Sequence, residues 1–258
     1  MNSTNFPVLV SNSCELLFSF QHYIISEAKG LMIENKKSGT SDLKEDESQV
    51  FCEELEIVRR TPLIRARACL ETALYWLDQG FQKDDNALSS TRLALAFVML
   101  ELRDFARALK MSKLVIDERP QSSNPRKLAT ARMYAAEASC ALGDAQAAMR
   151  FLVGDGQDDA FDRLASELGG VTLEVAASNV KGKARLARAQ AMVRSSASAA
   201  SAVLGNIGPA KQLAMSAQAM EDAYSSNREG STARRALIYC MLREGNSGAA
   251  LSLLRSLN

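Results

Sequence analysis

The side chains that most often carry catalysis or bind metals are scarce in this sequence. Its single histidine, His22, lies in an apolar stretch with helical spacing, so a multi-histidine metal site or a His-Glu-x-x-His helix cannot be assembled from these residues. A Ser-His-Asp or Cys-His triad would have to use His22, and we expect this residue to lie on a helix face instead.

Thiol, phosphate and carboxylate chemistry is equally poorly supported. The five cysteines are far apart and form no Cys-x-x-Cys pair, which favours buried, reduced thiols: Cys14, Cys52, Cys69, Cys140 and Cys240. Lys181-Gly182-Lys183 lacks the upstream glycine of a phosphate-binding loop. The carboxylates form no pattern distinct from solvated helix faces. We therefore expect no catalytic residue, no cofactor, no metal and no enzymatic activity.

Composition and charge favour packed helices and protein partners. The 258 residues include 39 alanines and only 5 prolines, and alanine is the strongest helix former. The 31 basic and 30 acidic residues give no general attraction to nucleic acid or to an anionic membrane. No apolar run is long enough to span a bilayer. With no signal-like segment and scattered cysteines, we expect the cytoplasm, with the nucleus as a second option.

Helical spacing dominates the chain. It predicts a first helix over 13–34 and a flexible acidic loop over 35–50. A further helix is expected from Pro62, a residue suited to a first helical turn, to Leu77. The glycine-containing segment 153–182, with a short helix candidate at 158–168, reads as an insertion that is either ordered or mobile.

Self-similarity at an offset of 40 residues organises these helices. Leu102-Arg103-Asp104 and Leu142-Gly143-Asp144 keep this offset, and so do Gly205-Asn206 and Gly245-Asn246. The same offset relates three further pairs: Ala108 and Ala148, Arg194 and Arg234, and Ala210 and Ala250. Each turn has one helical stretch before it and one after it. The sequence therefore predicts helix–turn–helix units, with an irregular helical bundle as the alternative.

The clearest unit follows the tetratricopeptide signature in its small residues and its proline. It reads Arg92-x2-Leu95-Ala96-x2-Met99, then Ala108-x3-Ser112, then Pro120, with the usual aromatic positions replaced. Paired helices cannot bury their apolar stripes alone, so such units stack. We expect an all-α fold of tetratricopeptide-like helix–turn–helix repeats, stacked as a single α-solenoid domain over 1–258.

The first helices of such repeats line a concave groove, and here that groove is predicted to be apolar. We assign protein binding to Leu93, Phe97, Leu100, Met133 and Tyr239. Such a groove suits an amphipathic partner helix or the protein's own insertion, while a purely structural role in the core is the alternative. Only Arg235 would serve a carboxylate clamp of the co-chaperone kind.

The basic stretch from Lys181 to Arg194 raises the alternative of an RNA-contacting helical protein. It lacks the interleaved aromatic side chains on which bases stack, so we expect a solvated helix face and no direct nucleic-acid binding. A generic tetratricopeptide adaptor remains a further alternative.

The helix Met133-Tyr134-Ala135-Ala136-Glu137-Ala138, followed by Leu142 and Ala148, carries a family resemblance. With the preceding segment 95–102, the later insertion and the two final helix pairs, residues 88–258 resemble the C-terminal part of the tenth-subunit family of the CCR–NOT mRNA deadenylase complex. The resemblance implies a non-catalytic scaffold subunit involved in mRNA deadenylation, mRNA decay and gene-expression regulation. It also implies two protein partners, the eleventh subunit and the large scaffold subunit.

Overall fold

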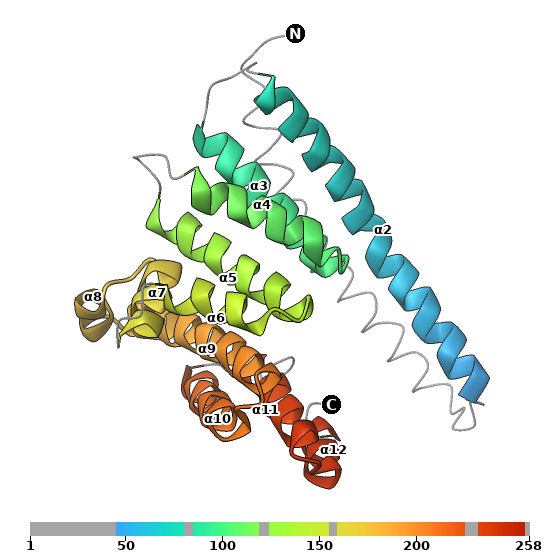
Figure 1. Ribbon diagram of the computed structural model, residues 1–258, viewed down its shortest axis with the longest axis vertical. Coiled ribbons are helices and arrows are strands. Elements are labelled where there is room, and N and C mark those ends of the chain that lie inside the picture. Colours follow the sequence, from blue (N-terminus) through green and yellow to red (C-terminus); the bar gives the residue numbers. More distant parts are fainter. Residues whose placement is uncertain (1–44, 80–84, 119–123, 155–158, 225–231, 256–258) are drawn as a thin grey trace. The chain divides into compact units, whose positions relative to one another are not determined.

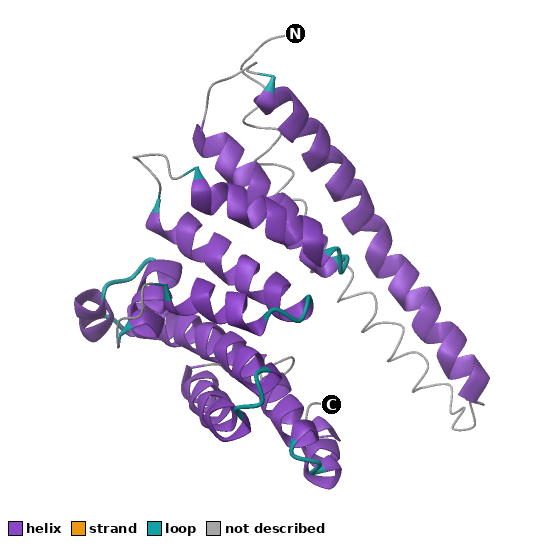
Figure 2. Cartoon of the chain, viewed as in Figure 1, coloured by secondary structure: helices purple, strands orange, loops and turns teal. Residues whose placement is uncertain are grey.

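The computed structural model describes residues 45–79, 85–118, 124–154, 159–224 and 232–255, and within these ranges the regular structure is entirely helical (Figures 1 and 2). The expected all-α class is confirmed. The helix expected over 13–34 lies outside the described residues. The chain divides into two compact units, residues 1–104 and 105–258. Each unit is described by itself, and the single domain expected over 1–258 stays a prediction.

The first unit contains two packed helices, α2 (Glu45–Asp78) and α3 (Asp85–Glu101). Two expectations are corrected here. Residues 45–50 belong to α2 rather than to an acidic loop, because carboxylates are favourable near the positive end of a helix dipole. Pro62 lies inside α2 rather than at a helix start, although its missing N–H removes one helical hydrogen bond.

The described residues of the second unit form nine helices. They are α4 (Phe105–Asp117), α5 (Pro125–Ala141), α6 (Ala145–Val153), α7 (Ala160–Gly169), α8 (Leu173–Ser178), α9 (Val180–Val203), α10 (Ile207–Tyr224), α11 (Thr232–Arg243) and α12 (Ser247–Arg255). Leaving aside α7 and α8, each helix packs on the next one in this order. This serial packing is the stacking expected of a tetratricopeptide-like solenoid.

Four three-residue repeat turns, 102–104, 142–144, 204–206 and 244–246, have the same conformation. Their central residues have positive φ angles: Arg103 62°, Gly143 88°, Gly205 86° and Gly245 77°. In each turn two N–H groups donate back to the ending helix, as Gly143 N does to Cys140 O (3.0 Å) and Asp144 N to Ser139 O (2.9 Å). These bonds satisfy carbonyls that the helix end would leave unpaired.

In two repeat turns the last residue also caps the next helix. Asp144 accepts a hydrogen bond from Ala147 N through its side chain (2.9 Å), and Asn246 accepts one from Ala249 N (3.2 Å). One short segment thus ends a helix and caps the next, which explains why three residues suffice to join the two helices.

The alanine that follows each repeat turn confirms the register of the repeats. Ala108, Ala148, Ala210 and Ala250 occupy the same position in α4, α6, α10 and α12, and each is at most 2% exposed. A methyl side chain at this position lets neighbouring helices approach closely. Many of the 39 alanines therefore act as packing contacts.

The predicted insertion over 153–182 is ordered where it is described. Leu164 and Ala165 of α7 are fully buried in one apolar cluster with residues of α5, α6 and α9. At Gly182 an added Cβ would lie 3.3 Å from the backbone of α8, so α8 crosses α9 at close range. The insertion is therefore part of the core of the second unit.

Candidate protein-binding surface

Three of the predicted binding residues lie on α3, in the first unit. Leu93 and Leu100 are buried, while Phe97 is half-buried. A buried side chain is not directly available to a partner. Of the three, Phe97 is therefore the residue most accessible to one. The binding role of these three residues stays a prediction.

The other two predicted residues lie in the second unit and differ in exposure. Met133 of α5 is buried in the apolar cluster that also contains Leu164 and Ala165 of the insertion helix α7. This packing favours the view that the protein's own insertion occupies the surface near Met133. Tyr239 of α11 is exposed and is open to a partner.

An arginine recurs at one position in the first helix of all four repeats, a feature that the sequence analysis detected only in part. Arg92, Arg132, Arg194 and Arg234 each stand eleven residues before the positive-φ residue of their repeat turn. Arg92 pairs with Asp78 at 3.5 Å, and Arg234 pairs with Asp222 at 3.3 Å. In both cases the arginine bridges to the preceding helix. The equal spacing between this arginine and the turn in every repeat is the signal by which the sequence could have revealed the recurrence.

Arg132 uses the same position differently. Its Nε donates to Phe151 O (2.8 Å) and its Nη2 to Leu152 O (3.3 Å), the carbonyls at the end of α6. A cation at a helix C-terminus is favoured by the helix dipole. Arg132 therefore holds α5 against the end of its own repeat partner.

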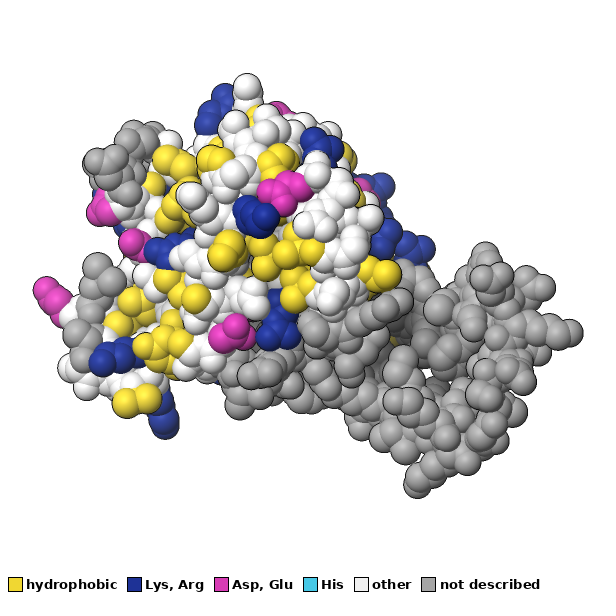
Figure 3. Space-filling model, turned by 90° about the horizontal axis from the view of Figure 1, so that it is seen from below, with side chains coloured by type: hydrophobic (Ala, Val, Ile, Leu, Met, Phe, Trp, Pro, Cys, Tyr) yellow, Lys and Arg dark blue, Asp and Glu magenta, His cyan; other side chains and the backbone are white. Residues whose placement is uncertain are grey.

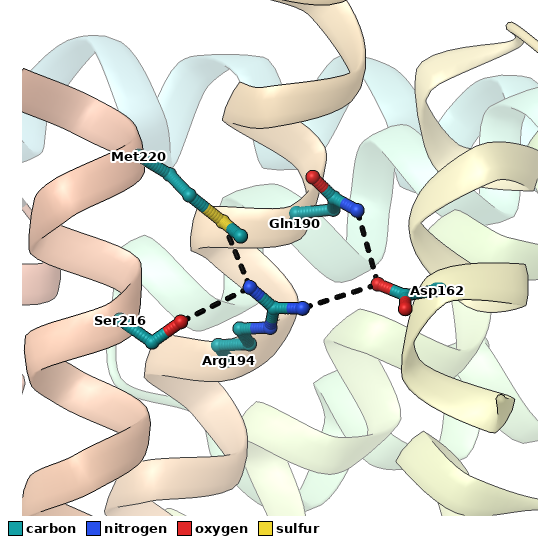
Figure 4. A network of polar contacts seen from close by, with 5 residues as sticks. All are labelled: Asp162, Gln190, Arg194, Ser216 and Met220. Atoms are coloured by element: carbon teal, nitrogen blue, oxygen red, sulfur yellow. Dashed lines mark hydrogen bonds and ion pairs between the residues drawn. The ribbon is translucent and has the colours of Figure 1, made fainter. Parts of the chain in front are cut away.

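Arg194 joins three helices (Figure 4). From α9 its Nη2 contacts Asp162 Oδ1 of α7 at 3.3 Å, while Nη1 lies 3.1 Å from both Ser216 Oγ and Met220 Sδ of α10. Gln190 Nε2 donates to the same Asp162 oxygen at 3.0 Å. This network ties the insertion to both helices of the third repeat.

The basic stretch Lys181–Arg194 is partly used inside the chain. Arg185 donates to Gly169 O at 2.8 Å, and Arg194 belongs to the network just described. Lys181, Lys183 and Arg188 are exposed along α9. Two of the five cations thus stabilise the fold, which weakens the alternative of a phosphate-binding stripe.

The last repeat carries a concentration of exposed apolar side chains. Tyr239 and Leu242 of α11 are exposed, as are Leu251 and Leu254 of α12. Figure 3 looks toward the end that carries α10, α11 and α12, and hydrophobic side chains lie there among charged side chains of both signs. Exposed apolar groups in such a cluster are typical of protein-interaction surfaces.

Within the described residues no group of histidine, cysteine, aspartate and glutamate could hold a metal ion. Of the three cysteines described, Cys69 is exposed, Cys140 is partly buried and Cys240 is buried, and all three are free thiols. Burial, with a smaller contribution from Glu137, raises the pKa of the Cys140 thiol. A raised pKa disfavours the thiolate, which is the reactive form.

Among the helices that the structure describes, none combines the length and apolarity needed to traverse a bilayer.

Comparison with known proteins gives one match. Residues 88–248 match the family model described as the CNOT10 tetratricopeptide repeat domain, which covers more than half of the chain. The match begins in α3 and ends in α12, so it includes all four repeat turns and the insertion. The resemblance expected over 88–258 is confirmed over this range. No curated protein and no solved structure matches the chain significantly.

Proposed function

Since the chain belongs to the CNOT10 tetratricopeptide repeat family, we propose that it is a non-catalytic, protein-binding scaffold subunit of the CCR–NOT complex. Membership of the family supports a tetratricopeptide protein-interaction role related to CCR–NOT. The proposal adds participation in mRNA deadenylation, mRNA decay and the regulation of gene expression and translation. It places the protein in the cytoplasm and also in the nucleus.

The family match over residues 88–248, which includes all four repeat turns, is the observation that carries this proposal. The stacked helix pairs support it, because repeats that bury a continuous core leave extended surfaces for partners. The partners we propose are the eleventh subunit and the large scaffold subunit of the complex. The deadenylase activity is assigned to other subunits.

Within this proposal the binding role of Phe97 and Tyr239 is the part most open to test. Both side chains are at least partly accessible and aromatic, and aromatic side chains dominate the energetics of many interfaces. Leu93 and Leu100 are buried on α3, the helix that carries Phe97, and Met133 is buried on α5.

The experiment is affinity purification of the tagged chain followed by mass spectrometry of the proteins bound to it. We expect CCR–NOT subunits in stoichiometric amounts. A double variant, Phe97→Glu with Tyr239→Glu, is expected to lose them while circular dichroism keeps its helical signal. Arg188→Glu, an exposed change on α9, serves as the control. Recovery of peptides or chaperones without any CCR–NOT subunit would replace the proposal with a generic adaptor.

A further inference from the structure

One face of α9, in the middle of the second unit, carries three exposed cations. Lys181, Arg185 and Arg188 follow one another at intervals of four and three residues, which places them on the same side of the helix. Met192, four residues after Arg188 and 47% exposed, continues this side. These four residues, the basic stripe, extend for about 16 Å, given the rise per residue of an α-helix.

Carboxylates do not compensate the charge of the basic stripe. The 24 residues of α9 include five cations and no aspartate or glutamate. Within the described residues no carboxylate forms an ion pair with Lys181, Arg185 or Arg188, and the one contact of Arg185 is to a neutral carbonyl, Gly169 O. Asp162 of the neighbouring α7 is already bound by Arg194. The positive charge of the stripe is therefore unbalanced within the described fold.

A further cation approaches the stripe from another helix. A Cβ atom built on Gly170 would lie 3.5 Å from Arg185 Nη2 and 3.8 Å from Arg126 Cδ. The side chain of Arg126, near the start of α5, therefore passes beside that of Arg185. Arg126 is exposed, and its guanidinium pairs with none of the described carboxylates. Positive charge from two helices thus converges near Arg185.

This accumulation of one charge has a cost, because like charges one helical turn apart repel each other and destabilise the helix. Other helices of the chain show the opposite arrangement. Arg67 of α2 pairs with Glu71 at 2.8 Å, and Arg163 of α7 pairs with Asp159 at 3.4 Å, each at a spacing of four residues. The whole chain has 31 basic and 30 acidic residues, so the excess on α9 is local. An anionic partner would relieve this repulsion.

The chemistry of the stripe fits an acidic protein segment better than a nucleic acid. The sequence of α9 contains no aromatic residue on which a base could stack. Met192 adds an exposed apolar contact beside the cations, which suits an aliphatic side chain rather than a phosphate backbone. Because the cations recur about once per turn, carboxylates with the same helical spacing can meet them in register.

We propose that the basic stripe docks an acidic helix of a partner protein. The carboxylates of that helix lie three and four residues apart and pair with the three cations of the stripe, and an aliphatic side chain packs on Met192. This inference goes beyond the proposed scaffold function, since it assigns a second binding surface with a different chemistry from the aromatic one.

The two surfaces are separate within the second unit. Tyr239 precedes Cys240, which packs in one cluster with Ala202 near the end of α9. Ala202 lies about 20 Å along α9 from Arg188, the last cation of the stripe. One chain can therefore bind complex subunits and the acidic helix at the same time.

Fluorescence anisotropy with the full chain and synthetic peptides tests the docking site. The probe is a helical 18-residue peptide with glutamates at i, i+4 and i+7 and a leucine at i+11. Its counterparts have glutamine in place of glutamate, or the same residues in scrambled order. We expect the glutamate peptide to bind at least tenfold more tightly than either counterpart and to weaken as salt is added. Equal binding of the three peptides would overturn the inference.

Charge reversal identifies the surface that binds. Lys181→Glu with Arg188→Glu, the stripe variant, should lose the glutamate peptide and gain binding of a lysine-substituted one, which also shows that the variant is folded. Lys110→Glu with Lys113→Glu, two exposed changes on α4 with the same effect on net charge, should keep the glutamate peptide. Unchanged binding by the stripe variant, or equal loss in both variants, would overturn the inference. A single-stranded RNA that binds the stripe more tightly than the glutamate peptide would do so as well.

Co-purification separates this inference from the proposed function. The stripe variant should retain the CCR–NOT subunits. Phe97→Glu with Tyr239→Glu should lose the subunits and still bind the glutamate peptide. Loss of subunits from the stripe variant would overturn the separation of the two surfaces and with it the inference. Failure of the unaltered chain to recover any subunit would instead overturn the proposed function, while binding of the glutamate peptide would still support the stripe.

Discussion

Arg194 and Asp162, 32 residues apart in the sequence, are joined at 3.3 Å between Nη2 and Oδ1. The aspartate belongs to α7 of the insertion, and the arginine belongs to the first helix of the third repeat. The arginine recurs in every repeat, whereas the insertion occurs once. The contact therefore joins the insertion to a position that the repeats share.

Removing this side chain tests how much the junction contributes. We expect Arg194→Ala to lower the free energy of unfolding by about 1–2 kcal/mol, because hydrogen bonds to both α7 and α10 are lost from a partly buried site. Arg188→Ala, on the same helix but exposed, should stay within about 0.5 kcal/mol of the unaltered chain. Urea unfolding followed by circular dichroism measures both. Equal effects of the two changes would mean that the network adds no stability.

Two substitutions in the repeat turns are expected to change the stability of the fold in opposite directions. Arg103 has a φ of 62°, in the left-handed region that favours glycine, and the other three repeat turns have glycine there. Arg103→Gly should therefore stabilise the fold by about 0.5–1 kcal/mol, although glycine loses more chain entropy on folding.

The reverse change is Gly143→Ala. It should destabilise the fold by about 1 kcal/mol through the backbone alone, because an added Cβ would meet no atom within 4 Å. Thermal unfolding of the two variants checks the pair. A shift in the same direction for both would contradict the shared turn conformation.

The repeat architecture could be predicted from the sequence because its signals are local. The offset of 40 residues between turns and between Ala108 and Ala148 reflects a backbone conformation and a packing position that few residue types satisfy. The resemblance over 88–258 was carried mainly by the helix 133–138, which is followed by Leu142 and Ala148. These features survive the replacement of the usual aromatic positions, since the buried alanine position leaves no room for a larger side chain and the positive φ favours glycine, which three of the four turns have.

Tertiary packing determines features of the structure that local sequence signals do not predict. A proline favours a first helical turn, yet Pro62 lies inside α2, so a local preference misplaced a helix end. The burial of Met133 depends on α7, a helix from the insertion that no periodicity relates to α5. Leu254 is exposed, whereas the residues nine positions after the positive-φ residue in the other three repeats are buried: Ser112, Leu152 and Ala214. Such a difference in burial cannot be read from residue type.

The alanine after each repeat turn gives a test of close packing. Ala210 is fully buried against Ala202 and Cys240, in a cluster of α9, α10 and α11. Ala210→Leu should destabilise the fold by about 1–3 kcal/mol, since the extra methylene groups have no space. Ala223→Leu, at an exposed position of α10, is the matched control and should change little. If both variants unfold at the same urea concentration, the alanine is not a packing contact.

Alkylation of the three described cysteines tests both the exposure of their thiols and the raised pKa of Cys140. With iodoacetamide at pH 8, peptide mass spectrometry should find Cys69 alkylated first, Cys140 later and Cys240 last, because Cys240 is fully buried. Burial raises the pKa of Cys140, so its alkylation rate should keep rising at a pH where an ordinary thiol has levelled off.

The same shift affects stability. The folded state holds the Cys140 proton more tightly than the unfolded state does. Its contribution to stability is therefore complete below the ordinary thiol pKa and is lost as the pH rises through the raised pKa of the folded state. In concentrated urea the three alkylation rates should converge. A native-state rate for Cys240 equal to that of Cys69 would show that α11 does not cover this thiol against α9 and α10.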